Sequence, residues 1–96
     1  DIKNNINSNV ILNMENSSCY EGIIKNGASL CFDKKSVWNV SGDSHVGKIE
    51  VVNNDLNYLK KNIKTNGYKI KYEVEKNKWL GGMKINTNDG GSIEPA

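Results

Sequence analysis

Arginine and glutamine are absent from this chain of 96 residues, and histidine occurs once, as His45. A single histidine excludes a metal site built from several imidazoles, and it leaves no basis in spacing for a cysteine–histidine catalytic pair. We interpret His45 as a solvent-facing residue at a corner of the chain. No hydrophobic run approaches the roughly 18 residues that a membrane-spanning helix needs, so the sequence predicts no membrane span.

A strong charge of either sign is also lacking. Thirteen lysines stand against eleven acidic residues, which gives a net charge of +2. Because these charges are spread evenly along the chain, the composition argues against nucleic-acid binding. The length allows one domain at most. The chain starts at Asp1 rather than Met, and we expect it to be processed or cut from a longer protein that is secreted or displayed at the cell surface.

Asparagine is abundant, with sixteen residues beside nine glycines. Asparagine side chains compete for backbone groups in helices and favour turns and left-handed positions. The composition therefore argues against a helical bundle and predicts a chain rich in turns. The complete preference for Lys over Arg and for Asn over Gln is equally consistent with an AT-rich genome, and the sequence leaves both explanations open.

Two similar units lie eighteen residues apart in the first half of the chain. At this offset Leu12 matches Leu30, and Tyr20 matches Trp38. Self-similarity of this kind is typical of stacked units, each of which buries its apolar face against the next. We therefore expect the matched residues to form inward-facing columns.

The second half of the chain repeats less strictly. The cleanest period-two alternation spans residues 68–74 and predicts a strand. Residues 55–61 are the only helical candidate, and it is short. An apolar cluster at residues 79–85 precedes a polar, glycine-rich tail at residues 86–96.

Together these patterns predict an all-β fold, a solenoid segment of about four coils, in which residues 1–85 form the coils and residues 86–96 form the tail. The alternative is an antiparallel β meander with Asn66-Gly67 as a type I′ hairpin turn, because an Asn-Gly pair between alternating residues is a strong hairpin signal.

The segment 36–49, SVWNVSGDSHVGKI, resembles a recurring unit of secreted bacterial right-handed parallel β-helix proteins, including autotransporter passenger domains. Together with residues 18–22 and 62–68, it is similar to the carbohydrate-binding β-helix family of Gram-positive surface proteins. The likeness covers residues 10–72 and depends on the order of the motifs. It implies a right-handed parallel β-helix that binds polysaccharide, with calcium in some members.

Lysines on the predicted strand are the first candidate binding residues. Lys69 and Lys71 alternate with apolar residues, and further lysines lie nearby in the sequence, at Lys60, Lys61 and Lys64. Such a basic stripe commonly protects a sheet edge from aggregation. The alternative is a binding surface for an acidic polysaccharide such as pectin.

Two other residues are candidates for binding. Trp79 precedes two glycines, and we expect its ring at the surface, where it could stack on a sugar. Asp43 could supply an oxygen ligand for calcium, although capping of its own turn explains it as well. The acids are otherwise scattered singly and arginine is absent, so no catalytic constellation is visible and we do not expect an enzyme.

We therefore expect a non-catalytic extracellular module that binds polysaccharide or a cell-surface glycan, as the C-terminal part of a larger β-helix. The alternatives are an adhesin-like or autotransporter-like surface scaffold and the non-catalytic coils of a polysaccharide lyase. The open end of a solenoid predicts a companion chain, a larger parent protein or self-association. In this arrangement Cys19 and Cys31 point outward from different faces, and we expect two free thiols.

Overall fold

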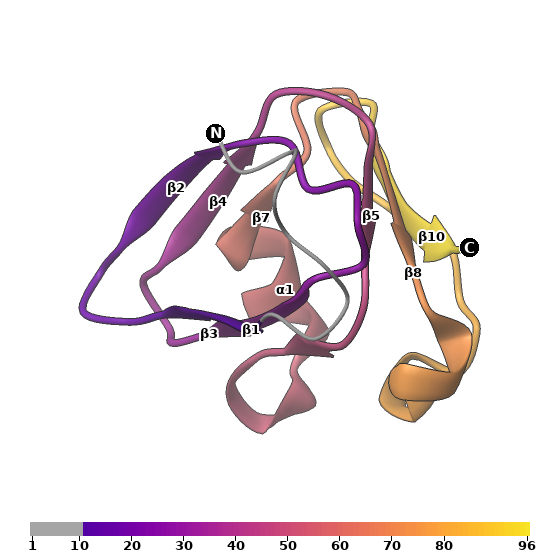
Figure 1. Cartoon of the computed structure of the whole chain (residues 1–96), viewed down its shortest axis with the longest axis horizontal. Helices are drawn as coiled ribbons and strands as arrows, with labels where there is room; N and C mark the ends of the chain where they lie inside the picture. Colours follow the sequence, from indigo (N-terminus) through magenta and orange to yellow (C-terminus); the bar gives the residue numbers. More distant parts are fainter. Residues whose placement is uncertain (1–10) are drawn as a thin grey trace.

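The structure is a computed structural model that describes residues 11–96. Six short strands come first along these residues, and helical turns then lie among the later strands (Figure 1). Their order is β1 (Ile11–Met14), β2 (Cys19–Gly22), β3 (Ser29–Phe32), β4 (Val37–Val40), β5 (Ser44–Val46), β6 (Ile49–Glu50), η1 (Val52–Asn54), α1 (Leu56–Asn62), β7 (Ile63–Lys64), β8 (Lys69–Tyr72), η2 (Val74–Lys76), η3 (Lys78–Leu80), β9 (Ile85–Asn86) and β10 (Ser92–Pro95). The three η elements are 3₁₀ helices.

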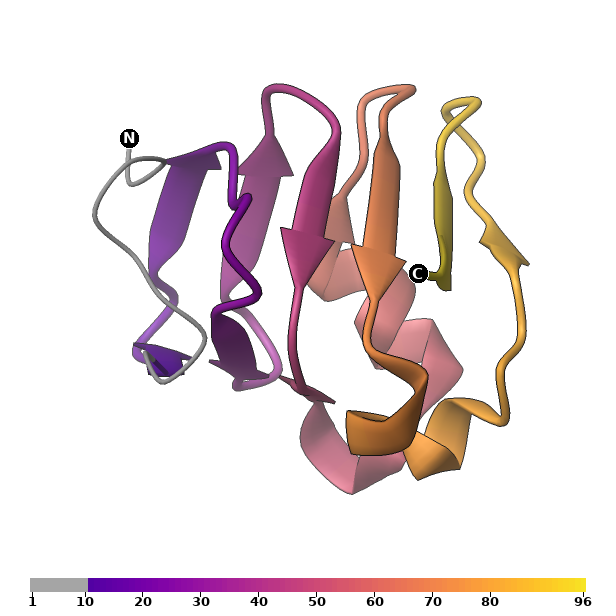
Figure 2. The same ribbon diagram turned by 45° about the vertical axis from the view of Figure 1, so that its right-hand side comes forward.

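The strands form three small sheets that face a common interior (Figure 1). Two sheets, in the orders β1-β3-β6 and β2-β4-β7, are wholly parallel. The third sheet has the order β5-β8-β10-β9 and is mixed, because β9 runs antiparallel to β10. Figure 2 shows how strands that are distant in the sequence lie side by side within each sheet.

The eighteen-residue offset is confirmed as a strand register. Leu12 lies opposite Leu30 in the β1–β3 pair, and Tyr20 lies opposite Trp38 in the β2–β4 pair. Side chains alternate between the two faces of a strand, so this register places the apolar positions of both strands on the same face. Leu30 and Trp38 are almost fully buried.

The expected all-β solenoid, a right-handed parallel β-helix of about four coils, is wrong. Residues 11–96 form several short strands in separate parallel and mixed sheets, with a substantial helical content, and no solenoid or closed sheet is found among them. The eighteen-residue pattern ends after its second copy, because α1 enters between β6 and β7 and two 3₁₀ helices enter between β8 and β9. The eighteen-residue periodicity lies within the first forty residues, so it carries no information about helices that come later in the chain.

The alternative antiparallel meander is also wrong. Asn66 and Gly67 do form a turn, since both have positive φ angles and the N–H of Tyr68 donates to the carbonyl of Thr65 over 2.9 Å. However, the flanking strands β7 and β8 belong to different sheets. The turn therefore redirects the chain from one sheet to the next instead of closing a hairpin.

The helical candidate is confirmed as α1. The side chain of Asp55 accepts a hydrogen bond from the N–H of Asn57 over 2.8 Å and caps the helix. Leu59 is fully buried, which fixes the inward face of this short helix. Because α1 has seven residues, its stability comes mainly from this packing and not from helix propensity.

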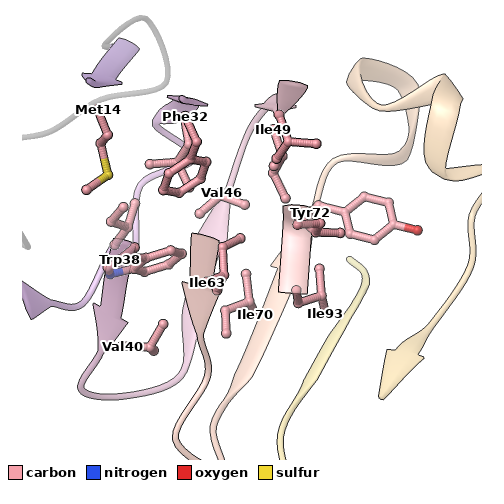
Figure 3. Packing of buried hydrophobic residues seen from close by; sticks show 14 of the residues in the cluster. Met14, Phe32, Trp38, Val40, Val46, Ile49, Ile63, Ile70, Tyr72 and Ile93 are labelled. Atoms are coloured by element: carbon pink, nitrogen blue, oxygen red, sulfur yellow. The ribbon is translucent and has the colours of Figure 1, made fainter. Parts of the chain in front are cut away.

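Apolar side chains from all three sheets share one core (Figure 3). Trp38 and Tyr72 are its largest fully buried members, and each has a polar group with a partner. The indole N–H of Trp38 donates to the carbonyl of Gly22 over 3.0 Å, and the hydroxyl of Tyr72 donates to the carbonyl of Met83 over 2.6 Å. Burial raises the pKa of Tyr72.

The segment 86–96, expected as a polar tail, takes part in this core. Its strand β10 pairs in parallel with β8, and Ile93 lies opposite Ile70. Both isoleucines are fully buried. In the described part of the chain, no helix is long and apolar enough to cross a membrane.

Candidate functional site

Strand β8 presents two lysines on the outer face of the mixed sheet. Ile70 and Tyr72 are fully buried, so the alternating residues Lys69 and Lys71 point away from the core and are exposed. Residues two apart on a strand lie about 7 Å from each other. The two ammonium groups, carried on flexible stems, can therefore reach neighbouring anionic groups of one ligand.

Strand β5 adds His45 beside Lys71. The parallel register pairs His45 with Lys71, while Ser44 and Val46 on either side of the histidine are buried. The imidazole of His45 thus lies on the same outer face as the lysine. His45 Nε2 contacts the carboxylate of Glu73, which follows β8 directly.

A third lysine comes from the segment 24–27, which runs alongside β5. The N–H of His45 donates to the carbonyl of Ile24 over 2.7 Å, and the N–H of Gly27 donates to the carbonyl of His45 over 3.1 Å. Ile24 is fully buried, so the next residue, Lys25, faces outward and is exposed.

An open groove of about 460 Å³ lies between these elements and is here called the lysine groove. Its lining residues come from the segment before β3, from β5 and its preceding turn, and from β8: Lys25, Asp43, Ser44, His45, Lys69 and Lys71. The volume lies within the usual range of ligand sites. The structure therefore brings together three of the residues expected from the sequence, Asp43, Lys69 and Lys71.

Asp43 positions the start of β8. Its Oδ1 accepts a hydrogen bond from the backbone N–H of Lys69 over 2.9 Å. This contact differs from the expected capping of its own turn, because it links two neighbouring strands of the mixed sheet. Among residues 11–96 no group of three or more His, Cys, Asp or Glu side chains is arranged to hold a metal ion.

Glu94 borders the groove on β10, opposite Lys71. The hydroxyl of Ser92 donates to its carboxylate over 2.6 Å. This hydrogen bond is the main cause of the lowered pKa of Glu94; desolvation opposes it, and the charges of Lys84, Lys69 and Lys71 each lower the pKa by less. Lys69 and Lys71 therefore make only a minor contribution to the lowered pKa of this carboxylate.

Trp79 lies in a different groove, here called the tryptophan groove, with a volume of about 390 Å³. Its lining is formed by the turn after β5, by residues around η1 and by residues of η2 and η3: Lys48, Glu50, Val51, Asn54, Glu75, Lys76, Lys78 and Trp79. The indole N–H of Trp79 donates to the carbonyl of Ile49 over 3.0 Å. The ring is half-buried against the core, and the structure does not bring it together with Lys69 and Lys71.

Sequence reasoning missed Lys25 and gave His45 no binding role. Both become site residues through the pairing of the segment 24–27 with β5 and of β5 with β8, whose offsets are longer than eighteen residues. The sequence signal is weak, because each residue has only one buried apolar neighbour: Ile24 precedes Lys25, and Val46 follows His45. Conversely, Lys60 and Lys61 lie on α1 and Lys64 lies on β7, away from the mixed sheet.

Cys19 and Cys31 are both free thiols, as expected. Cys31 is on β3, where desolvation, followed by a hydrogen bond with Glu50, raises its pKa. A raised pKa reduces the thiolate fraction and hence the reactivity of this cysteine.

Comparison with known proteins gives no relative from which a role could be transferred. No protein-family model matches the chain, and neither a curated protein nor a solved structure matches it significantly.

Proposed function

We propose that this chain is a non-catalytic extracellular binding module whose ligand is an acidic polysaccharide. The observation that carries the proposal is the lysine groove, where Lys25, Lys69 and Lys71 converge from two separate segments of the chain on one face of the mixed sheet. Carboxylates on neighbouring sugars of a polyuronate are the corresponding ligand groups.

The spacing of the lysines supports a repeating polyanion. Neighbouring strands are about 4.8 Å apart, so the backbones at Lys25 and Lys71 are separated by roughly 10 Å across β5. Lys69 lies one strand repeat along β8 from Lys71. Three ammonium groups in this triangular arrangement fit several carboxylates of one chain better than they fit a single isolated anion.

The charge balance of the groove supports the same ligand class. Among residues 11–96, Asp43 is the one acidic residue that lines the groove, and its carboxylate already accepts the N–H of Lys69. Lys69 and Lys71 also have a small favourable charge effect on the carboxylate of Glu94. Because the lysines are exposed, binding should be moderate in strength and sensitive to salt.

The proposal includes a secreted or cell-surface location, since acidic structural polysaccharides occur outside cells. The groove is open along the sheet face, and an extended polymer can cross it without its ends entering a cavity. An adhesin-like scaffold has no comparable observation in its favour.

Retention on polygalacturonate tests the proposal. The wild-type chain should bind this polymer, and the double variant Lys69→Ala/Lys71→Ala should bind it about fivefold to thirtyfold more weakly, because two exposed charge contacts are lost. Raising the salt concentration from about 0.05 M to about 0.5 M should weaken wild-type binding more than binding of the variant.

The matched control is Lys35→Ala/Lys60→Ala, which removes the same charge from two exposed positions outside the groove. This control should retain nearly the wild-type affinity. Equal losses in both double variants would show that net charge alone drives retention and would contradict the groove. Absence of wild-type retention at low salt would contradict the function itself.

A further inference from the structure

We infer that the tryptophan groove is a second sugar-binding site, which takes a neutral glucose-type pyranose of a β-linked glucan stacked on Trp79. This second site goes beyond the proposed function, because its ligand carries no charge and its lining residues are separate from those of the lysine groove. The inference depends on the fixed ring of Trp79 and on the hydrogen-bonding side chains around it.

Trp79 is held in one orientation. Its N–H bond to the carbonyl of Ile49 fixes the edge of the indole, and the ring packs on the hydrophobic core while remaining half-buried. A ring fixed in this way loses little conformational entropy when a ligand binds. It therefore offers a rigid apolar platform on the wall of the groove.

The side chains around this platform suit sugar hydroxyl groups. Glu50 and Glu75 can accept hydrogen bonds, whereas Lys76 and Lys78 can donate them. Asn54 can do both, and it holds a left-handed backbone conformation at the groove edge. Glu50 is kept in place by Lys48 at a distance of 2.7 Å. The lining is mostly polar, with Val51 and Trp79 as its apolar members, so one flat apolar surface is surrounded by groups that can hydrogen-bond to hydroxyls.

The two grooves differ in their charge. Three lysines and two glutamates line the tryptophan groove, so positive and negative charges nearly balance, whereas lysines dominate the lysine groove. A neutral ligand fits the balanced groove. Glucose-type pyranoses present only axial C–H groups on both ring faces, which gives the flat apolar surface that stacks on an indole.

Tryptophan fluorescence tests the site directly with cellopentaose as the probe. The chain has two tryptophans, and Trp38 is fully buried, so a ligand that contacts the surface should change the emission of Trp79. We expect a saturable change in the wild-type chain. The variant Lys69→Ala/Lys71→Ala should give the same titration, because its substitutions lie in the other groove.

Glu75→Gln and Trp79→Phe separate a binding role from a structural one. Glu75 is exposed on η2, so Glu75→Gln should fold normally and weaken cellopentaose binding about fivefold in calorimetry. Trp79→Phe should weaken binding at least as much. The matched control is Glu15→Gln, an exposed acid outside both grooves, which should bind as the wild type does.

The inference is overturned if cellopentaose causes no saturable fluorescence change in the wild-type chain. It is also overturned if Glu75→Gln, shown to be folded by circular dichroism, binds cellopentaose with unchanged affinity. Either result leaves the polygalacturonate experiment unaffected, because that experiment depends on the lysine groove.

Discussion

At the scale of single residues, asparagine serves two structural purposes. Asn16, Asn53 and Asn66 hold left-handed backbone conformations, with φ angles of 59°, 55° and 53°. Asparagine tolerates this region better than most residues, and the prediction of a chain rich in turns is confirmed at these positions. A biased genome can supply asparagines, but these positions are ones at which the backbone itself favours them.

The amide groups of buried asparagines form hydrogen bonds with backbone N–H and C=O groups outside the strand ladders. Asn62 donates to the carbonyls of Asp33 and Ser36 over 2.8 and 2.7 Å, although its own Oδ1 is buried and has no hydrogen-bond partner among residues 11–96. Asn77 is better satisfied, since it accepts one backbone hydrogen bond and donates two. An amide side chain carries the same donor and acceptor groups as a peptide unit, and the short stem of asparagine keeps them in a fixed place.

Asp33 makes stability depend on pH at the acid end. The hydroxyl of Ser36, followed by backbone N–H groups, lowers the pKa of Asp33 from 3.8 to about 2. Because the pKa is lower in the folded state, Asp33 stabilises the fold fully above about pH 4, and this contribution is lost as the pH falls through about 2. We therefore expect the urea midpoint to fall between about pH 5 and about pH 2.5.

The variant Asp33→Asn checks the source of this acid sensitivity. It should be less stable than the wild type at about pH 5 and should lose less on acidification. Part of the sensitivity should remain, since hydrogen bonds from Thr65, Thr87 and backbone N–H groups also lower the pKa of Asp89. An equally large acid effect in Asp33→Asn would show that Asp33 does not contribute.

At the scale of elements, the sequence predicted those parts in which apolar residues alternate over a full strand. The β1–β3 and β2–β4 registers follow from such alternation, and so does the outward direction of Lys69 and Lys71. The lysine groove could not be assembled in advance, because Lys25 reaches it through a segment without a regular strand pattern. Two-residue strands such as β6 and β7 are also too short to show any periodicity.

The turns between the elements follow from side-chain hydrogen bonds that sequence patterns do not show. Asn77 lies between η2 and η3, yet its Oδ1 accepts the N–H of Ile49 at the edge of β6 over 2.7 Å. Its amide also donates to the carbonyl of Gly47 over 2.8 Å. This one side chain fastens two 3₁₀ helices to a strand that precedes them by almost thirty residues.

We expect Asn77→Ala to lower the free energy of unfolding by about 2–4 kcal/mol, because it leaves buried backbone groups unpaired. Urea denaturation followed by circular dichroism measures this loss. Asn88→Ala is the matched control: Asn88 is exposed, and its substitution should change stability by less than about 0.5 kcal/mol. Similar effects of both substitutions would show that the hydrogen bonds of Asn77 contribute little to stability.

At the scale of the whole molecule, three small sheets depend on one core. No single sheet is large, and the three strands β6, β7 and β9 have only two residues each. The inward side chains of all three sheets pack together, so each sheet is stabilised by the other two (Figure 3). The chain should therefore unfold in one cooperative transition, with the segment 86–96 included.

Ile93 tests whether this segment belongs to the core. The residue is fully buried, and we expect Ile93→Ala to lower the free energy of unfolding by about 2–4 kcal/mol. Met83→Ala is the control, because Met83 is a large apolar residue with 45% of its surface exposed. If thermal or urea unfolding of Ile93→Ala matches that of the control, the segment is a dispensable tail.

The Asn66-Gly67 turn is a site at which the chain can deamidate slowly. In an Asn-Gly pair the glycine nitrogen attacks the carbonyl carbon of the asparagine side chain and expels ammonia, and water then hydrolyses the resulting succinimide to aspartate or isoaspartate. The ring closure needs local freedom of the backbone. In the folded chain, the Asn66 amide donates to Asn39 and to the carbonyl of Val40 over 2.6 and 2.9 Å, and these bonds hold it away from attack. The backbone N–H of Asn66 also donates to the carboxylate of Asp89 over 2.7 Å, so we expect deamidation at this turn to require local opening of the fold. A carboxylate in place of the amide would lose both hydrogen bonds that the amide donates.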